Sequence, residues 1–133
     1  MIKLFIGGKG SGKTKTLIEL VNNAANASKG NVVCIEKGDK LIHDITYKAR
    51  LIDTDYYSVA DAEALYGFIA GILASNADIT DIFVDSALKI CGNDNGAFAE
   101  MLSKLDKITK DVSLVMTASI AVEDCPAEIK AYA

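Results

Sequence analysis

Residues 7–14 read Gly7-Gly8-Lys9-Gly10-Ser11-Gly12-Lys13-Thr14, which matches the pattern G-x-x-x-x-G-K-[ST] over its full length. The apolar run at residues 2–6 comes directly before this segment and predicts a buried strand. From Lys13 onward, apolar residues recur at helical spacing, and Lys29-Gly30 indicate the end of that helix. The glycine-rich loop, residues 7–14, is therefore expected to connect a strand to a helix.

A loop of this composition and position suits phosphate binding. Glycine lets the backbone curl so that successive N–H groups point at phosphate oxygens, and the following helix adds free amides and a positive dipole end. Lys13 is expected to reach the β- and γ-phosphates of a nucleotide, and the Thr14 hydroxyl to bind Mg²⁺. Lys9 and Lys15 are equally consistent with solvated surface charges. The predicted cofactor-binding residues are Gly7, Gly8, Lys9, Gly10, Ser11, Gly12, Lys13, Thr14 and Lys15.

The composition narrows the class of protein. The chain has 133 residues, a net charge of −4 and 50% hydrophobic residues, which suits one domain spanning residues 1–133. The acidic balance argues against sequence-independent nucleic-acid binding, which needs a surplus of Lys and Arg. Three separated cysteines argue against a disulfide framework and favour the reducing cytoplasm. The longest uncharged stretch, residues 64–77, is too short to span a bilayer.

Apolar runs alternate with amphipathic helical segments along the whole chain. Runs that are continuously apolar, rather than alternating, indicate strands of a parallel sheet with helices on both faces. We therefore predict an α/β fold, a three-layer α/β/α sandwich with a mainly parallel sheet of four to five strands. The predicted strands are residues 2–6, 32–35, 79–85 and 112–118, with residues 50–54 as an additional edge strand.

The glycine-rich loop resembles the Walker A motif of P-loop nucleoside triphosphatases, and Asp81-Ile82-Phe83-Val84-Asp85 looks like their Walker B strand. In that family the last Asp holds Mg²⁺ through water, and the resemblance implies this role for Asp85. The strand ending in Thr117 resembles the one that carries a polar sensor residue in the RecA-like division, where it is inserted between the P-loop and Walker B strands. The resemblance implies the P-loop fold, ATP and Mg²⁺ as ligands, and a Thr117 hydroxyl that faces the γ-phosphate. An ordinary threonine at a strand end fits the sequence as well.

Two features depart from the family pattern. Efficient ATP hydrolases of that division follow the Walker B Asp with a Glu that orients the attacking water, whereas Ser86 stands here, and the chain contains no Gln for that task. Glu36, at the carboxyl end of the predicted second strand, is a candidate for a displaced catalytic base or else a solvated loop carboxylate. Arg50 is the only arginine, so an activating residue from another protein or subunit would supply what the chain lacks.

The strand order that the resemblance implies makes residues 2–6 an edge strand. The tail after the sensor-like strand is short and contains Pro126 but no convincing apolar run, so it is not expected to cover that edge. An apolar edge strand beside a nucleotide site favours pairing with another chain. A homodimer or larger homo-oligomer is therefore predicted.

The leading functional hypothesis is an ATP-binding P-loop protein that acts as a weak or partner-activated Mg²⁺-dependent ATPase. A small-molecule kinase is an alternative, because the loop and the pair Asp85-Ser86 loosely resemble cobinamide kinases and thymidine kinases. A non-catalytic, nucleotide-sensing adaptor of a larger ATPase machine is a third reading. The guanine signature N-K-x-D does not occur, which favours ATP over GTP.

Overall fold

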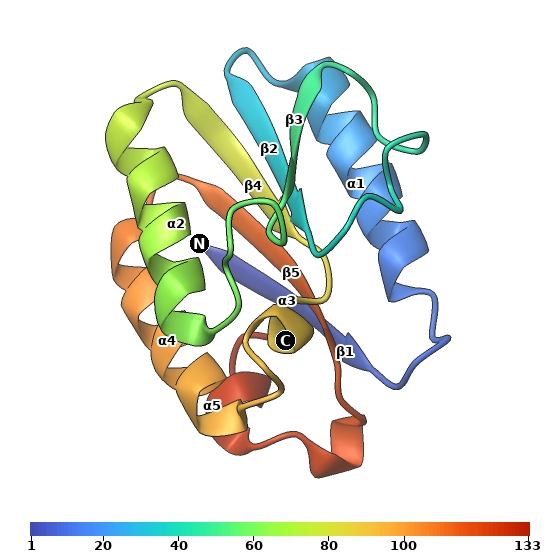
Figure 1. Ribbon diagram of the computed structural model, residues 1–133, viewed down its shortest axis with the longest axis vertical. Helices are drawn as coiled ribbons and strands as arrows, with labels where there is room; N and C mark the ends of the chain where they lie inside the picture. Colours follow the sequence, from blue (N-terminus) through green and yellow to red (C-terminus); the bar gives the residue numbers. More distant parts are fainter.

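Five parallel strands form one sheet in the computed structural model, which describes all 133 residues. Their order across the sheet is β1-β5-β4-β2-β3 (Figure 1). Every predicted strand is present, with bounds that differ by a single residue, and the prediction of an α/β fold with a parallel sheet is confirmed. The strands are β1 (Ile2–Gly7), β2 (Asn31–Glu36), β3 (Ala49–Asp53), β4 (Ile79–Val84) and β5 (Ser113–Ser119).

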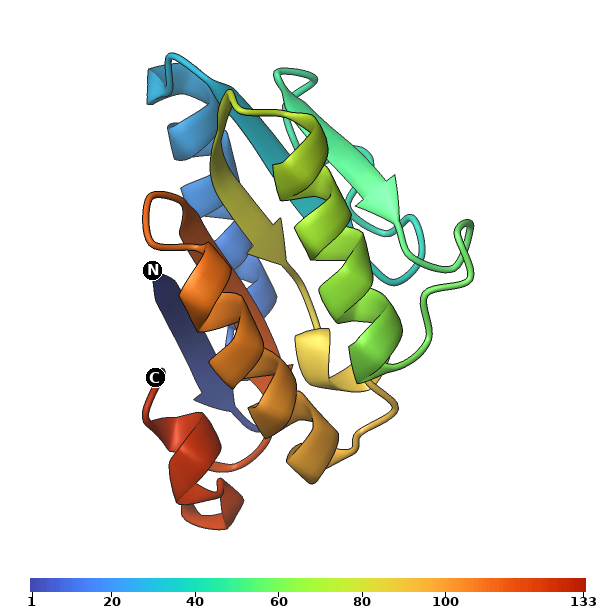
Figure 2. The same ribbon diagram turned by 90° about the vertical axis from the view of Figure 1, so that its left-hand side faces the viewer.

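Helices cover both faces of the sheet, which gives the three layers that were predicted. α1 (Lys13–Ala27) packs against one face. α2 (Ala62–Ser75) and α4 (Asn95–Ile108) lie side by side on the other face, as Figure 2 shows with α1 behind the sheet. None of the helices is both long enough and apolar enough to cross a membrane.

Each central strand supplies two hydrophobic cores, because successive side chains of a strand point to opposite faces. In β2, Val32 and Cys34 belong to the core beneath α1. Val33 and Ile35 belong to the larger core beneath α2 and α4. This double burial explains why the strands are continuously apolar in the sequence rather than alternating.

The position of β5 between β1 and β4 agrees with the strand order that the resemblance implies. β5 pairs with β1 from Ile2↔Leu114 to Gly7↔Ser119 and with β4 up to Val84↔Met116. Because the strands are parallel, their carboxyl ends meet at one edge of the sheet, the lower end in Figure 1. Residues that follow β1, β4 and β5 are therefore brought together there.

β1 is an edge strand as predicted, but the expectation that the tail leaves this edge uncovered is wrong. The chain continues after β5 through a 3₁₀ turn (Val122–Asp124) into α5 (Ala127–Lys130), a short helix that Pro126 opens. Ile129 of α5 is completely buried, and the Leu4 amide donates a hydrogen bond of 2.8 Å to the Tyr132 carbonyl. The tail thus covers part of the outer edge of β1, which weakens the case for a homodimer formed there.

Candidate functional site

The glycine-rich loop joins β1 to α1 through backbone conformations that favour glycine. Gly10 and Gly12 have φ angles of 79° and 84°, in the left-handed region. At Gly7, a Cβ atom would lie only 2.8 Å from the Ser11 hydroxyl oxygen. The Lys13 ammonium spans the loop, donating hydrogen bonds to the Gly8 carbonyl at 2.8 Å and to the Ser11 hydroxyl at 3.2 Å. The path of the loop therefore favours glycine at positions 7, 10 and 12.

A hydrogen-bonded cluster lies beside this loop and centres on Asp85, which directly follows β4. Asp85 is 8% exposed, and its Oδ1 accepts hydrogen bonds from the Thr14 hydroxyl at 3.1 Å and from the Thr117 hydroxyl at 2.8 Å. The pairing of Val84 with Met116 sets the next residues, Asp85 and Thr117, beside each other. The structure thus brings together three side chains that the sequence placed at one site.

The Thr117 hydroxyl has a second partner besides the carboxylate of Asp85. It accepts a hydrogen bond of 2.8 Å from the backbone amide of Ser86. Ser86 has a φ angle of 57°, unusual for a residue other than glycine, at the point where the chain turns from β4 into the next helix. Thr117 therefore holds both the carboxylate and the turn that follows it.

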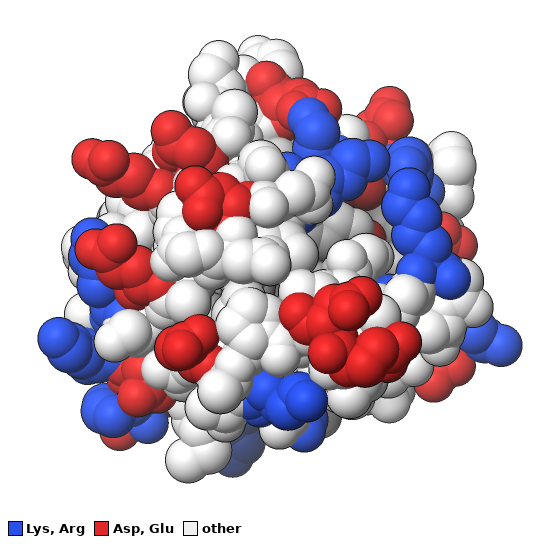
Figure 3. Space-filling model, turned by 90° about the horizontal axis from the view of Figure 1, so that it is seen from below, with Lys and Arg blue, Asp and Glu red and all other residues white.

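A cavity of about 640 Å³ opens above this cluster, and no hydrophobic residue lines it. Residues 9–15 of the predicted site line it together with Thr117 and Ser119, while Gly7 and Gly8 form the base of the loop. Seen from below in Figure 3, basic side chains gather around a hollow in the face where the strands end. Five lysines line the cavity, and none of them is in an ion pair: Lys9, Lys13, Lys15, Lys40 and Lys89.

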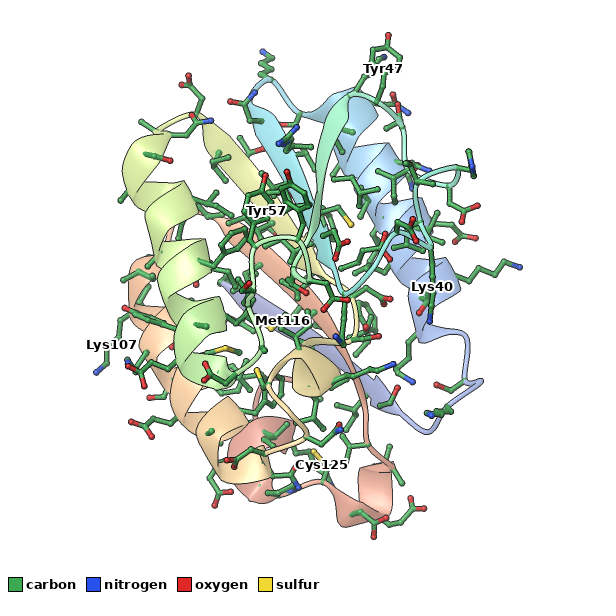
Figure 4. The ribbon with its side chains drawn as sticks, in the orientation of Figure 1. Lys40, Tyr47, Tyr57, Lys107, Met116 and Cys125 are labelled. Carbon is green, nitrogen blue, oxygen red and sulfur yellow. The ribbon has the colours of Figure 1, made fainter.

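Five residues of the lining were not among the predicted site residues: Ser86 and Ser119, at the ends of two strands, and Lys40, Lys89 and Asn93. Lys40 lies on the loop between β2 and β3, near the start of α1 (Figure 4). Lys89 belongs to α3 (Ala87–Ile90), a single helical turn directly after Asp85-Ser86, and Asn93 follows it. Their position just after the carboxyl ends of β2 and β4 is the signal that could have pointed to them.

Glu36, the candidate catalytic base, does not line the cavity. Its side chain is buried, and its Oε2 accepts a hydrogen bond of 3.0 Å from the Leu41 amide. Burial raises the pKa of Glu36 above its ordinary value; the Leu41 hydrogen bond opposes this shift, and the negative charge of nearby Asp85 adds to it. In this structure the carboxyl group holds the loop that carries Lys40.

The remaining candidate groups lie outside the cavity lining or are buried and unreactive. Arg50 lies on β3 and is not part of the cavity lining. Burial raises the pKa of Cys34 to about 12, helped by the negative charges of Glu36 and Asp85. All three cysteines are free and buried, and no group of three His, Cys, Asp or Glu side chains is arranged to hold a metal ion.

The groups in the cavity and beneath it are of the types that suit an anion and a small hard cation. The lysines and the amides of the loop offer hydrogen-bond donors to anionic oxygens. The oxygens of Thr14 and Asp85, 3.1 Å apart, are hard ligands of the kind that Mg²⁺ binds directly or through water. No protein-family model matches the chain, and no curated protein shows significant similarity to it.

Proposed function

We propose that this chain binds ATP together with Mg²⁺ in the lysine-lined cavity and hydrolyses it slowly or only with a partner. The observation that carries the proposal is the contact of Thr14 and Thr117 with Asp85 directly beneath the glycine-rich loop. The phosphate-loop pattern also occurs by chance in sequences, so the structure around it has to fit the role as well. Here the strand before it, the helix after it and the acidic residue beside it are all present.

Each part of the site has a definite task in this proposal. The loop amides and the first turn of α1 would bind phosphate oxygens, and Lys13 would move from the Gly8 carbonyl to the β- and γ-phosphates. Thr14 and Asp85 would hold the magnesium ion, which when bound neutralises charge that develops on the phosphates. The buried carboxylate is kept in place by hydroxyl donors from Thr14, Thr117 and Ser86.

Slow hydrolysis follows from the groups available to activate water. Ser86 occupies the position after Asp85, no carboxylate is among the lining residues, and Asp85 beneath them is assigned to Mg²⁺ in this proposal. Glu36 is buried and occupied by the Leu41 amide. A general base must reach the water that it activates, directly or through one other water. Ser86 lines the cavity but carries no basic group, and Glu36 does not line the cavity.

Calorimetric titration of the protein with ATP, GTP and ADP in the presence of Mg²⁺ tests the binding part of the proposal. Lys13→Ala is expected to weaken ATP binding by about 10- to 100-fold, the effect of losing one charge-assisted hydrogen bond. Lys107→Ala is the matched control, because it removes the same charge from an exposed position on α4 away from the cavity (Figure 4). Equal affinity of wild type and Lys13→Ala would contradict the proposal.

Steady-state assays of phosphate release test the catalytic part. Wild type alone is expected to turn over ATP far more slowly than about 1 per second, the low end of typical enzymes. Asp85→Asn is expected to abolish the residual activity while leaving the fold intact, as circular dichroism would check. A rate of several per second without a partner would refute slow hydrolysis but leave ATP binding untouched.

A further inference from the structure

The cavity carries more positive charge than the glycine-rich loop alone provides. Lys40 and Lys89 come from outside the loop, the first from the β2–β3 connection and the second from α3. Neither forms an ion pair, and the acidic residues of the chain stay out of the lining. A concave surface lined by one sign of charge raises the local concentration of the opposite ion.

Lys89 is held in place by the packing and the termination of α3. The other residues of this single turn, Ala87, Leu88 and Ile90, are all buried. The turn ends in a Schellman motif, in which the Asn93 amide donates to the Leu88 carbonyl at 2.9 Å and the Gly92 amide to the Lys89 carbonyl at 3.0 Å. The backbone beneath Lys89 is therefore fixed before any ligand binds.

Asn93 adds an uncharged hydrogen-bond donor to the lining. Its φ angle of 59° is in the left-handed region, which is sparsely populated for residues with a side chain. Ser86, at the other end of α3, has a φ angle of 57°, and both residues line the cavity. Asparagine adopts this conformation more readily than other residues do, whereas serine rarely adopts it. Of the three residues other than glycine with a positive φ angle, Ser86 and Asn93 line the cavity and Ser58 does not.

The loop that carries Lys40 is tied down on both sides of this residue. On one side the Gly38 amide donates to Asp53 Oδ1 at 2.8 Å, and on the other the Leu41 amide donates to Glu36 Oε2 at 3.0 Å. Leu41 itself is buried in the core beneath α1. Lys40 is thus an exposed side chain on an anchored backbone, which reduces the entropy lost when it binds an anion.

We propose that Lys40, Lys89 and Asn93 form a second anion subsite, which binds a small phosphate monoester beside the nucleotide. This inference rests on the proposed function, because the loop amides, Lys13 and Mg²⁺ are then assigned to the triphosphate and leave Lys40 and Lys89 without an anion. A phosphate monoester carries a charge of about −1.5 to −2 at pH 7 and three acceptor oxygens. Two ammonium groups and one amide provide the matching charge and donors.

The size and chemistry of the cavity agree with two ligands of this type. Its volume of about 640 Å³ is large enough for a triphosphate group with a small neighbour. The lining contains no aromatic or aliphatic side chain, so an apolar second ligand would find no surface to bury. A small, strongly anionic ligand is the class that these side chains favour.

Calorimetry with glycerol 3-phosphate as the probe tests the subsite in two steps. The protein is first saturated with Mg²⁺ and the non-hydrolysable analogue β,γ-imido-ATP, and glycerol 3-phosphate is then titrated into this complex. Wild type is expected to bind the probe without releasing the analogue, and uncharged glycerol is expected not to bind. The double variant Lys40→Ala/Lys89→Ala is expected to bind the probe at least about tenfold more weakly, while Lys107→Ala binds it as wild type does.

The outcomes separate the subsite from the proposed function. Release of the analogue by the probe, or unchanged affinity in the double variant, would overturn the subsite, because both lysines would then serve the nucleotide or nothing. Failure of the analogue itself to bind would refute the proposed function. The probe is in that case titrated into the protein alone, where dependence on Lys40 and Lys89 supports the subsite and independence from them overturns it.

Discussion

Replacement of Thr117 by valine tests the hydrogen-bonded cluster around Asp85 most directly. Thr117 is 2% exposed, and its hydroxyl oxygen lies 2.8 Å from Asp85 Oδ1 and 2.8 Å from the Ser86 amide nitrogen. Valine has the same shape but neither donates nor accepts, so the carboxylate loses one donor and the amide loses its acceptor. Each buried polar group left without a partner costs about 1–3 kcal/mol.

The expected decrease in the free energy of unfolding lies in the lower part of the range obtained by adding the costs of the two groups. Asp85 keeps the hydroxyls of Thr14 and Ser86 as donors, and the half-buried Ser86 amide can gain partial compensation from water. We therefore expect Thr117→Val to lower the free energy of unfolding by about 2–3 kcal/mol, a large share of the 5–15 kcal/mol typical of a domain. Urea denaturation at pH 7, followed by circular dichroism, measures this difference.

Thr117→Ser provides the matched control, because it keeps the hydroxyl and removes one methyl group. Its expected cost is about 1 kcal/mol, the loss of one buried methyl. The reasoning is refuted if the valine variant is as stable as the serine variant, since the hydroxyl would then contribute nothing. A valine variant that is destabilised as expected and also binds Mg²⁺-ATP more weakly would link the cluster to the proposed site.

Three further experiments test other parts of the molecule. Because burial raises the pKa of Glu36, the free energy of unfolding of wild type should fall as pH rises from about 4.5 through the folded-state pKa. Glu36→Gln keeps an acceptor for the Leu41 amide and should lack this fall when urea unfolding is measured from pH 4 to 8. Parallel pH curves for the two proteins would contradict this prediction. Burial raises the pKa values of Cys34 and Cys91 to about 12, so both thiols should resist a thiol reagent at pH 8 in the folded protein. They should react once urea unfolds the protein. Rapid labelling of either cysteine in the native protein would contradict their burial. Ile129→Ala should lower the free energy of unfolding by about 2–5 kcal/mol, because Ile129 is fully buried where the tail covers β1. A decrease below about 1 kcal/mol in urea unfolding would mean that the tail does not pack there.

The sequence predicts the parts of the fold that depend on local pattern. The central strands β2, β4 and β5 each contain a continuous apolar run, and such runs identify central parallel strands without knowledge of their neighbours. The glycine-rich loop is equally local, since its strand, its glycines and its helix are contiguous. The proximity of Asp85 and Thr117 required the strand order, which the resemblance supplied and the sheet has.

The features that the sequence did not predict depend on contacts between distant segments or on elements too short to show a pattern. The place of Lys40 follows from hydrogen bonds of its loop to Glu36 and Asp53, which a single sequence does not reveal. α3 is one turn long, too short for helical periodicity to be detected. The tail docks through two buried side chains, Cys125 and Ile129, and the hydrogen bond between Leu4 and Tyr132, in a segment without an apolar run.

The distribution of charge reconciles an acidic chain with a phosphate-binding proposal. Five of the 14 basic residues line one cavity, although acidic residues outnumber basic ones by 18 to 14 in the whole chain. A polynucleotide needs an extended basic surface that follows many phosphates, and a concave pocket of about 640 Å³ cannot provide one. A mononucleotide needs only local charge, loop amides and a metal ion, all at short range, where the negative remainder of the surface is largely screened by salt. The net charge therefore argues against nucleic acid without arguing against a nucleotide.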